Sequence, residues 1–278
     1  MTALPPSVRG RSLRGHLRVV AAPDARGQTY LRDQSFRAPL HLSKPHREAD
    51  ALVINVVSPT AGLFDGDEVD LALTVEPGAR VVLTTPSACR IHRARGERPA
   101  VMRQEITVRA GGFAEYFPEP VIPQSGARYH QETTLRVDPG GTLLFFEWLT
   151  PGRVAHGELF AYAALQWHTD LWIGESLAAR ERYTLRPDGP HLAGLRLAHP
   201  AGHYLGVFVV GDVPPPCEII NALQGADVDI GCGPLAIDGA WTIKALCAQS
   251  LVARQTLAAL RAALYHALEL EMPSLRRF

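Results

Sequence analysis

Four polar segments hold the residues that could do chemistry, and each follows a predicted strand at a turn rich in glycine and proline. They are residues 58–69 (SPTAGLFDGDEV), 84–93 (TTPSACRIHR), 115–123 (EYFPEPVIP) and 147–158 (EWLTPGRVAHGE). Carboxylates suit hard cations and acid–base work, while a thiol near an imidazole suits softer metals. Each segment also has a structural interpretation, because aspartate–glycine turns and buried cysteines are common without a ligand.

Glu147 is the acidic residue that most needs a partner, because it follows an apolar run and would lose water on burial. Arg153, in the same segment, is the expected partner in an ion pair. In the first segment, Asp67 either belongs to a carboxylate cluster for a cation or fixes a turn in which Gly66 supplies the positive φ. Both interpretations of Asp67 stay open at this point.

The familiar motifs GxSxG, GxxxxGK[ST], GxGxxG and HExxH do not occur in the sequence, which removes the specific hydrolase, nucleotide and zincin interpretations. His199 and His203 have the four-residue spacing of two metal ligands on one helix face. A proline and a glycine between them argue against that helix, so we predict a turn with two solvated histidines. His41 and His46 are likewise expected in a loop.

Short runs of alternating apolar and polar residues extend from Leu17 to about Leu185, which is typical of half-buried strands. Residues 73–86, 106–120 and 135–151 share one scheme: a strand, then proline or alanine followed by glycine, then a strand and a proline. The period is about 30 residues, within the range of repeat proteins. We therefore predict a mainly β, stacked, solenoid-like (β-helical) arrangement of short strands, with an ordinary β-meander as the alternative.

The C-terminal part has a different pattern, with strands predicted near residues 203–210 and 240–246. A helix is expected to begin at the prolines from Pro214, and a second to run from an N-cap at Ser250 to about Leu270. Leucines at helical spacing should form the buried side of the second helix: Leu251, Leu257, Leu260, Leu264 and Leu268. We predict one domain over residues 1–278, with a β-rich body over about 14–190 and a small α+β portion over about 200–278 packed on it.

The composition narrows the class of partners. The chain has 28 basic and 28 acidic residues, so its formal net charge is zero, which argues against nucleic-acid and polybasic membrane binding. Its four cysteines lie far apart without a CxxC pair, as expected for reduced thiols in a cytoplasmic protein. Neither a signal peptide nor an apolar run long enough to span a bilayer is evident. We expect a cytoplasmic protein.

Taken in order, the four segments resemble the urease accessory protein UreD family, also called UreH, in a somewhat divergent form. The family patterns GG..GGD, TT…[ST]K.YR, E..P…IP and E….GR…GE match GLFDGD, TTPSACRIHR, EYFPEPVIP and EWLTPGRVAHGE. The matching positions are Gly62, Gly66, Thr84, Thr85, Arg90, Arg93, Pro118, Pro123, Gly152, Arg153, Gly157 and Glu158. Departures from the usual residues occur at Thr60, Ala61, Asp65, Cys89, His92 and Phe278.

The resemblance implies a β-rich stack of strands without enzymatic activity. Such proteins act as a scaffold that binds apo-urease and recruits UreF and UreG, and GTP hydrolysis by UreG drives assembly of the nickel site. No tightly bound cofactor is implied, but transient nickel is, because the family is associated with an internal polar passage. Carried over, the passage residues would be Asp67, Cys89, Glu147 and Glu181. We expect the three carboxylates to converge in space.

The alternative function is a β-solenoid carbohydrate-active hydrolase or lyase that uses paired carboxylates such as Asp67 and Glu147. It leaves the GR…GE spacing unexplained, and only 7% of the residues are aromatic, which is few for stacking on sugars. A third possibility is an interaction module without any metal role. Apolar surface on the C-terminal helices is the candidate docking surface for partners.

Overall fold

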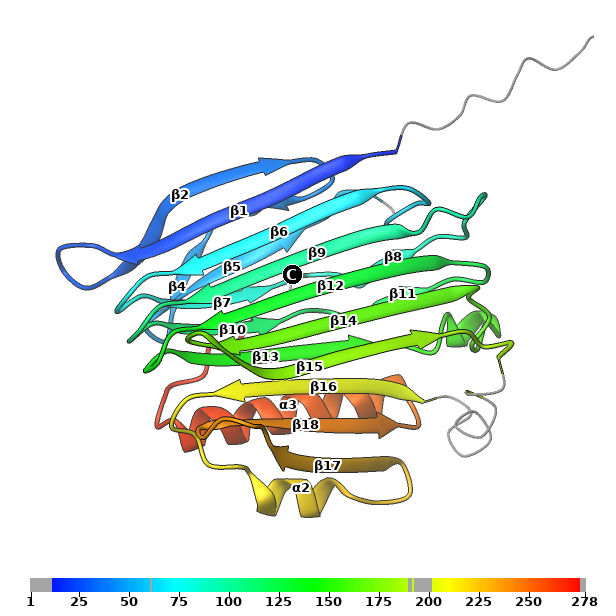
Figure 1. Cartoon of the computed structure of the whole chain (residues 1–278). Coiled ribbons are helices and arrows are strands. Elements are labelled where there is room, and N and C mark those ends of the chain that lie inside the picture. Colours follow the sequence, from blue (N-terminus) through cyan, green and yellow to red (C-terminus); the bar gives the residue numbers. More distant parts are fainter. Residues whose placement is uncertain (1–11, 61, 190–191, 193–201, 276–278) are drawn as a thin grey trace, which may run out of the picture.

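A computed structural model describes residues 12–60, 62–189, 192 and 202–275. Two β-sheets lie face to face, and the chain passes back and forth between them as a β-solenoid of about four turns within these residues (Figure 1). In the same described part, 51% of residues are in strands and 12% in helices. The prediction of a mainly β, solenoid-like stack is therefore confirmed.

The front sheet in Figure 1 is built on parallel strands, with antiparallel strands β2 and β15 at its edges. Its order is β15 (Ser176–Leu185), β14 (Ala164–Ile173), β12 (Arg128–Val137), β9 (Ala100–Val108), β6 (Glu68–Val75), β1 (Arg14–Pro23) and β2 (Thr29–Arg37).

In the back sheet the strands from β5 to β13 form a parallel stack, and antiparallel strands lie on both sides of it. Its order is β17 (Val228–Pro234), β18 (Ala240–Cys247), β16 (His203–Val210), β13 (Thr142–Leu149), β10 (Phe113–Phe117), β7 (Arg80–Thr84), β5 (Ala51–Val57) and β3 (His41–Leu42). Three short strands pair beside this path: β4 (His46–Glu48), β8 (Cys89–Ile91) and β11 (Val121–Pro123). His41 and His46 thus lie in short strands, and their predicted loop is wrong.

The repeat in the sequence corresponds to one turn of the solenoid. Val75, Val108, Val137 and Ile173 lie side by side in four successive strands of the front sheet, so one turn takes about 30 residues. This stacking is what the recurring strand and glycine scheme indicated.

The turns of the repeat stack as well. Gly78, Gly111 and Gly140 all have positive φ angles of 77°, 72° and 84°, a conformation that glycine adopts without steric cost. The N–H of Gly78 donates to Gly111 and the N–H of Gly111 donates to Gly140, at 3.2 and 2.9 Å. Each of these equivalent turns has the positive φ angle that favours glycine, and each copy of the repeat has glycine at this position.

The main hydrophobic core fills the space between the sheets. Strand β6 alternates strictly, and its buried residues Val69, Leu71, Leu73 and Val75 belong to this core. A second core lies on the outer side of the back sheet, where the helices α2 (Cys217–Leu223) and α3 (Ser250–Ala267) pack. The strands of the α+β portion join the back sheet through pairing of β16 with β13.

Helix α3 follows the predicted pattern with two differences. Leu257, Leu260 and Leu264 are buried and Leu268 is partly buried at the C-cap, but Leu251, in the first turn, is 62% exposed. The N-cap residue is Gln249 rather than Ser250, and no side chain caps the helix. Helix α2 begins at Cys217, after the N-cap Pro216, because Pro214 and Pro215 are each followed by a proline, which disfavours their helical conformation.

A buried ion pair attaches α3 to the back sheet. Glu115 of β10 is fully buried, and its carboxylate accepts hydrogen bonds from the guanidinium of Arg261 and, at 2.6 Å, from the hydroxyl of Tyr265. Arg261 also donates to the carbonyl of Pro273 at 2.9 Å. Because both charges are desolvated, loss of either partner would leave the other uncompensated.

His203 is the first residue of β16 and is 2% exposed, so the predicted turn with two solvated histidines is wrong for this residue. Burial lowers the pKa of its imidazole to about 4, and the ring stays neutral. His199 lies outside the described residues. None of the helices in the described part of the chain combines the length and the apolar character needed to cross a bilayer.

Candidate functional site between the sheets

The four polar segments come together at one end of the solenoid. Strand β8 of the second segment pairs with β11 of the third, and β11 pairs with the end of β13, where the fourth begins. The first segment reaches β8 through a bridge between Leu63 and Ile91. Figure 1 shows β8 and β11 at the same end of the stack. Their order in the sequence is therefore the order of successive turns.

Three of the matching positions, Gly62, Thr84 and Thr85, hold these loops in place. The Thr84 hydroxyl donates to the Phe117 carbonyl at 2.5 Å, and the Thr85 hydroxyl accepts from the Glu119 N–H at 2.8 Å. Gly62 has a φ of 133°, and a side chain there would overlap the carbonyl of Arg90. These residues join one turn of the solenoid to the next.

An ion pair between Arg153 and Glu158, five residues apart, joins the two ends of the loop in the fourth segment. The Arg153 guanidinium donates to both carboxylate oxygens of Glu158, with 2.8 Å between Nε and Oε2, and Glu158 also accepts from the Ser125 N–H. Arg153 therefore does not pair with Glu147, and that prediction is wrong. The reason is proximity, because the short 3₁₀ turn over Val154–His156 folds Glu158 back onto Arg153. This pairing lowers the pKa of Glu158 to about 2.

An internal cavity of about 100 Å³ lies beside these segments, between the sheets. It is lined by polar residues from both sheets as well as by apolar core residues. The residues with polar side chains include Ser58, Thr60, Thr85, Ser87, Cys89, Gln104, Tyr116, Glu119, Tyr129, Gln131, Glu147 and Trp167. Glu119 also forms a bidentate ion pair with Arg254 of α3, with both distances 2.9 Å.

A hydrogen-bonded network connects the polar side chains of this interior. Gln104 donates to the Tyr116 hydroxyl at 2.8 Å and accepts from Thr133 at 3.1 Å. Tyr129 donates to Gln131 at 2.9 Å, and Gln131 donates to Thr133 at 3.4 Å. The network forms because the parallel register of β9 and β12 places Gln104 beside Thr133. It satisfies buried polar groups that would otherwise destabilise the core.

Glu147 is 3% exposed and its carboxyl group lines the cavity. Its Oε1 accepts from Trp167 Nε1 at 2.8 Å and from the Thr169 hydroxyl at 3.3 Å. Its Oε2 has no hydrogen-bond partner among the described residues. Burial raises the pKa of Glu147, although the charge of Lys244 and the Trp167 hydrogen bond act in the opposite direction. One oxygen of this carboxylate is therefore available to a cation or a proton.

Lys244 links Glu147 to Glu181, two of the predicted passage residues. Its Nζ donates to Glu181 Oε2 at 2.8 Å, lies 2.8 Å from Oε1 in the same ion pair, and lies 4.2 Å from the centre of the Phe208 ring. The register places Glu147, Gly206 and Lys244 side by side across three strands. Because Gly206 has no side chain, the ends of both side chains come close to it: a Cβ there would lie 2.9 Å from Glu147 Oε2 and 3.3 Å from Lys244 Nζ. The charge of Lys244 acts on Glu147 from this position.

Asp67 is also 3% exposed, but its contacts differ from those of the other two carboxylates. Its two oxygens accept from the backbone N–H groups of Leu13 and Phe64, at 2.8 and 2.9 Å. The residue fixes the turn before β6, where Gly66 has a φ of 78° as expected. The structure thus brings Glu147 and Glu181 together through Lys244 and gives Asp67 a separate set of partners.

Cys89 lines the same cavity as Glu147. Burial raises the pKa of its thiol to about 12, so the thiol keeps its proton near neutral pH. Since the thiolate is the form that binds metals, Cys89 is a weak ligand in this environment. Carboxylate oxygen is therefore the main metal-binding atom type that the cavity offers.

The amino-acid sequence matches a known protein family. The profile described as "UreD urease accessory protein" matches residues 13–278. "Urease accessory protein UreD" of Opitutus terrae is 36% identical over 91% of this chain and 94% of its own length. The Acetivibrio thermocellus protein of the same name is 31% identical over 74% of this chain and 80% of its own length. "Urease accessory protein UreD 2" of Streptomyces griseus is 31% identical over 74% and 72%.

The chain belongs to the UreD family. Its departures from the family patterns have local structural consequences. The His92 imidazole stacks on the Phe64 ring at 4.3 Å, and the Thr60 hydroxyl donates to the carbonyl of Gly62 at 3.2 Å. The ring contact connects the first two UreD segments, and the Thr60 hydrogen bond lies within the first. Ala61 and Phe278 lie outside the described residues.

Sequence reasoning missed several polar residues of this UreD-family interior, namely Gln104, Tyr129, Gln131, Trp167 and Lys244. For Gln104 and Gln131 a signal existed, because each occupies an inward position of an alternating strand, where an apolar residue is usual. Lys244 gave no such signal, since its position depends on the antiparallel register of β18 with β16.

Proposed function

We propose that this UreD-family chain is a non-enzymatic scaffold in the maturation of urease. It binds the urease apoprotein together with UreF-like and UreG-like partners in the cytoplasm, and it assists insertion of nickel into the urease active site. The match over residues 13–278 and the printed names of the relatives support this role. The GTPase activity of the assembled complex belongs to a partner.

The observation that carries the nickel part of the proposal is the free Oε2 of Glu147 in the interior. A buried carboxylate is costly to ionise unless a cation neutralises it, and Ni²⁺ accepts oxygen ligands. Nickel must displace the proton that the raised pKa favours, so binding is weak and reversible. Weak binding at one carboxylate suits a passage, whereas a closed set of strong ligands would trap the ion.

The other predicted passage residues have narrower roles in this proposal. Glu181 contacts nickel only when Lys244 releases it, and Cys89 only after losing a strongly held proton. Asp67 shapes the first segment through its backbone hydrogen bonds. Glu147 is therefore the passage residue whose substitution gives the clearest result.

Exposed Leu251 at the start of α3 offers apolar surface to a partner. The neighbouring Arg254 and Glu119 link that helix to the cavity-lining loop, so a partner bound there would also contact the end of the stack.

The proposal is tested by complementation in a cell that has urease and its other accessory genes but lacks this one. We expect urease from such cells to contain little nickel, and we expect the full chain to restore the nickel content and to co-purify with urease and the UreF-like partner. Normal nickel content without the chain would contradict the proposal. The hydrolase or lyase alternative needs Asp67 and Glu147 as a catalytic pair. Both oxygens of Asp67 accept backbone hydrogen bonds, so among the described residues this pair is not favoured.

A further inference from the structure

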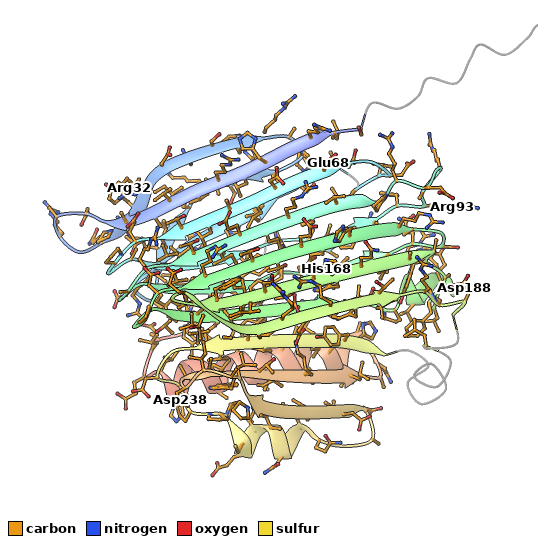
Figure 2. All side chains as sticks on the ribbon, in the orientation of Figure 1. Arg32, Glu68, Arg93, His168, Asp188 and Asp238 are labelled. Atoms are coloured by element: carbon orange, nitrogen blue, oxygen red, sulfur yellow. The ribbon has the colours of Figure 1, made fainter. Side chains whose placement is uncertain are left out.

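A cluster of two histidines and a glutamate lies on the outer face of the front sheet, away from the cavity. His130 and Glu132 belong to β12, and His168 belongs to β14. One ligand atom from each lies within 4.8 Å of the other two. Figure 2 shows His168 near the middle of this face.

The strand register explains why these residues meet. His130 and Glu132 are two positions apart in one strand and therefore share a face, and the parallel pairing sets Glu132 directly beside His168. The alternate residues of these strands, such as Gln131 and Thr169, are buried on the inner side. Two neighbouring strands, each paired on both sides, thus hold the three side chains side by side.

The distances suit a metal ion. His130 Nε2 lies 3.3 Å from His168 Nδ1 and 3.4 Å from Glu132 Oε1. In a tetrahedral site with bonds of about 2.0–2.1 Å, neighbouring ligand atoms are separated by about 3.3 Å. The imidazole planes are inclined at 79° to each other, so the rings do not stack. His130 Nε2 is thus already at ligand spacing from both of its neighbours.

Neighbouring charges orient the glutamate. Arg103 Nε donates to Glu132 Oε2 at 3.2 Å, and this contact holds the other oxygen toward His130. The Arg103 charge is shared with Glu68 and Asp70, at 3.3 and 3.6 Å.

On the other side of the cluster, Arg182 is paired in register with His168 and forms an ion pair with Asp170 at 2.7 Å. The cations that flank the cluster are thus each matched by carboxylates, which limits their repulsion of a bound metal ion.

We propose that His130, Glu132 and His168 form a surface site for a divalent first-row transition metal ion such as Ni²⁺ or Zn²⁺. Two imidazoles with one carboxylate favour these ions over Mg²⁺ and Ca²⁺, which prefer oxygen ligands. Water completes the coordination on the solvent side. The site goes beyond the proposed function, because the front sheet separates it from the cavity and its occupancy does not depend on Glu147.

The test is metal binding by the full chain in equilibrium dialysis against NiCl₂ or ZnCl₂. We expect His168→Asn to lose one bound ion per chain or to weaken that site at least tenfold, and Glu132→Gln to weaken it by a smaller factor. Because these side chains are on the surface, the circular dichroism spectrum should stay unchanged. His16→Asn is the matched control, since His16 lies on the same face and bonds Ser35 outside the cluster.

A further control separates this site from the proposed passage. Glu147→Gln should leave the surface site intact, and a folded chain that fails to assist urease maturation should still bind the ion at His168. Equal stoichiometry and affinity in the wild-type chain, His168→Asn and Glu132→Gln would overturn the proposal. Equal losses in His16→Asn and His168→Asn would do the same.

Discussion

Substitution of Gly206 by alanine is a sharp test of how the interior is built. The residue lies in β16 between Glu147 and Lys244, in ordinary strand geometry, so the backbone itself tolerates alanine. The new methyl group would lie 2.9 Å from Glu147 Oε2, 3.2 Å from the Tyr204 hydroxyl and 3.3 Å from Lys244 Nζ. The first distance is shorter than a Cβ contact allows and the other two are tight, so the ends of these side chains must shift.

The expected cost follows from overpacking of a buried site, which typically destabilises by about 1–3 kcal/mol. Alanine also restricts the unfolded chain, which stabilises by about 0.4–1 kcal/mol where there is room. The midpoints of the two ranges give a net loss of about 1.3 kcal/mol in the free energy of unfolding, and the ranges themselves allow a loss of up to about 2.6 kcal/mol. The melting temperature should fall by several degrees.

The assay is urea or thermal unfolding of the purified chain, with Gly231→Ala as the control. Gly231 lies in β17, and a methyl group there meets no atom within 4 Å, so this variant should be as stable as the wild type or slightly more stable. In a Glu147→Ala background, Gly206→Ala should cost less, because the nearest atom is gone. Equal stability of Gly206→Ala and Gly231→Ala would refute the described arrangement.

Two further predictions concern the ion pairs. Arg261→Met leaves the Glu115 carboxylate buried without its cation and should lower the free energy of unfolding by about 3–5 kcal/mol in urea titrations; a loss below about 1 kcal/mol would argue against the pair. Glu158 has its pKa lowered from 4.5 to about 2 by Arg153, so its stabilising effect is complete above pH 4.5 and is lost as the pH falls through about 2. Glu158→Gln should therefore be less stable than the wild type at pH 7, and the difference measured by thermal unfolding should shrink steadily below pH 4.5. A difference that stays constant down to pH 3 would contradict this assignment.

The repetition of the fold could be predicted from the sequence because each turn of a solenoid places equivalent residues under the same constraint. Gly78, Gly111 and Gly140 stack in one column and share the positive φ, so the sequence repeats glycine at the same place in each copy. The polar segments also recur once per turn, since β8 and β11 are equivalent parts of successive turns and pair side by side.

The partners of charged residues could not be predicted in the same way. Arg153 pairs with Glu158 because a short turn brings the two together, whereas Glu147 lies near Lys244 through pairing of strands far apart in the sequence. His203 is buried because β16 runs between β13 and β18, a position that its local proline and glycine neighbours did not indicate. Partners of this kind depend on strand order, which local patterns do not contain.

The most direct test of the central claim is the nickel content of urease matured with Glu147→Gln. The amide retains the shape of the side chain and can still accept from Trp167 and Thr169, so the fold and partner binding should persist. We predict that urease co-expressed with this variant contains clearly less nickel than urease co-expressed with the wild type, while Glu175→Gln, in the hairpin between β14 and β15, has no effect. Full nickel occupancy with Glu147→Gln, in a chain that still co-purifies with urease, would contradict the role of this carboxylate in nickel transfer.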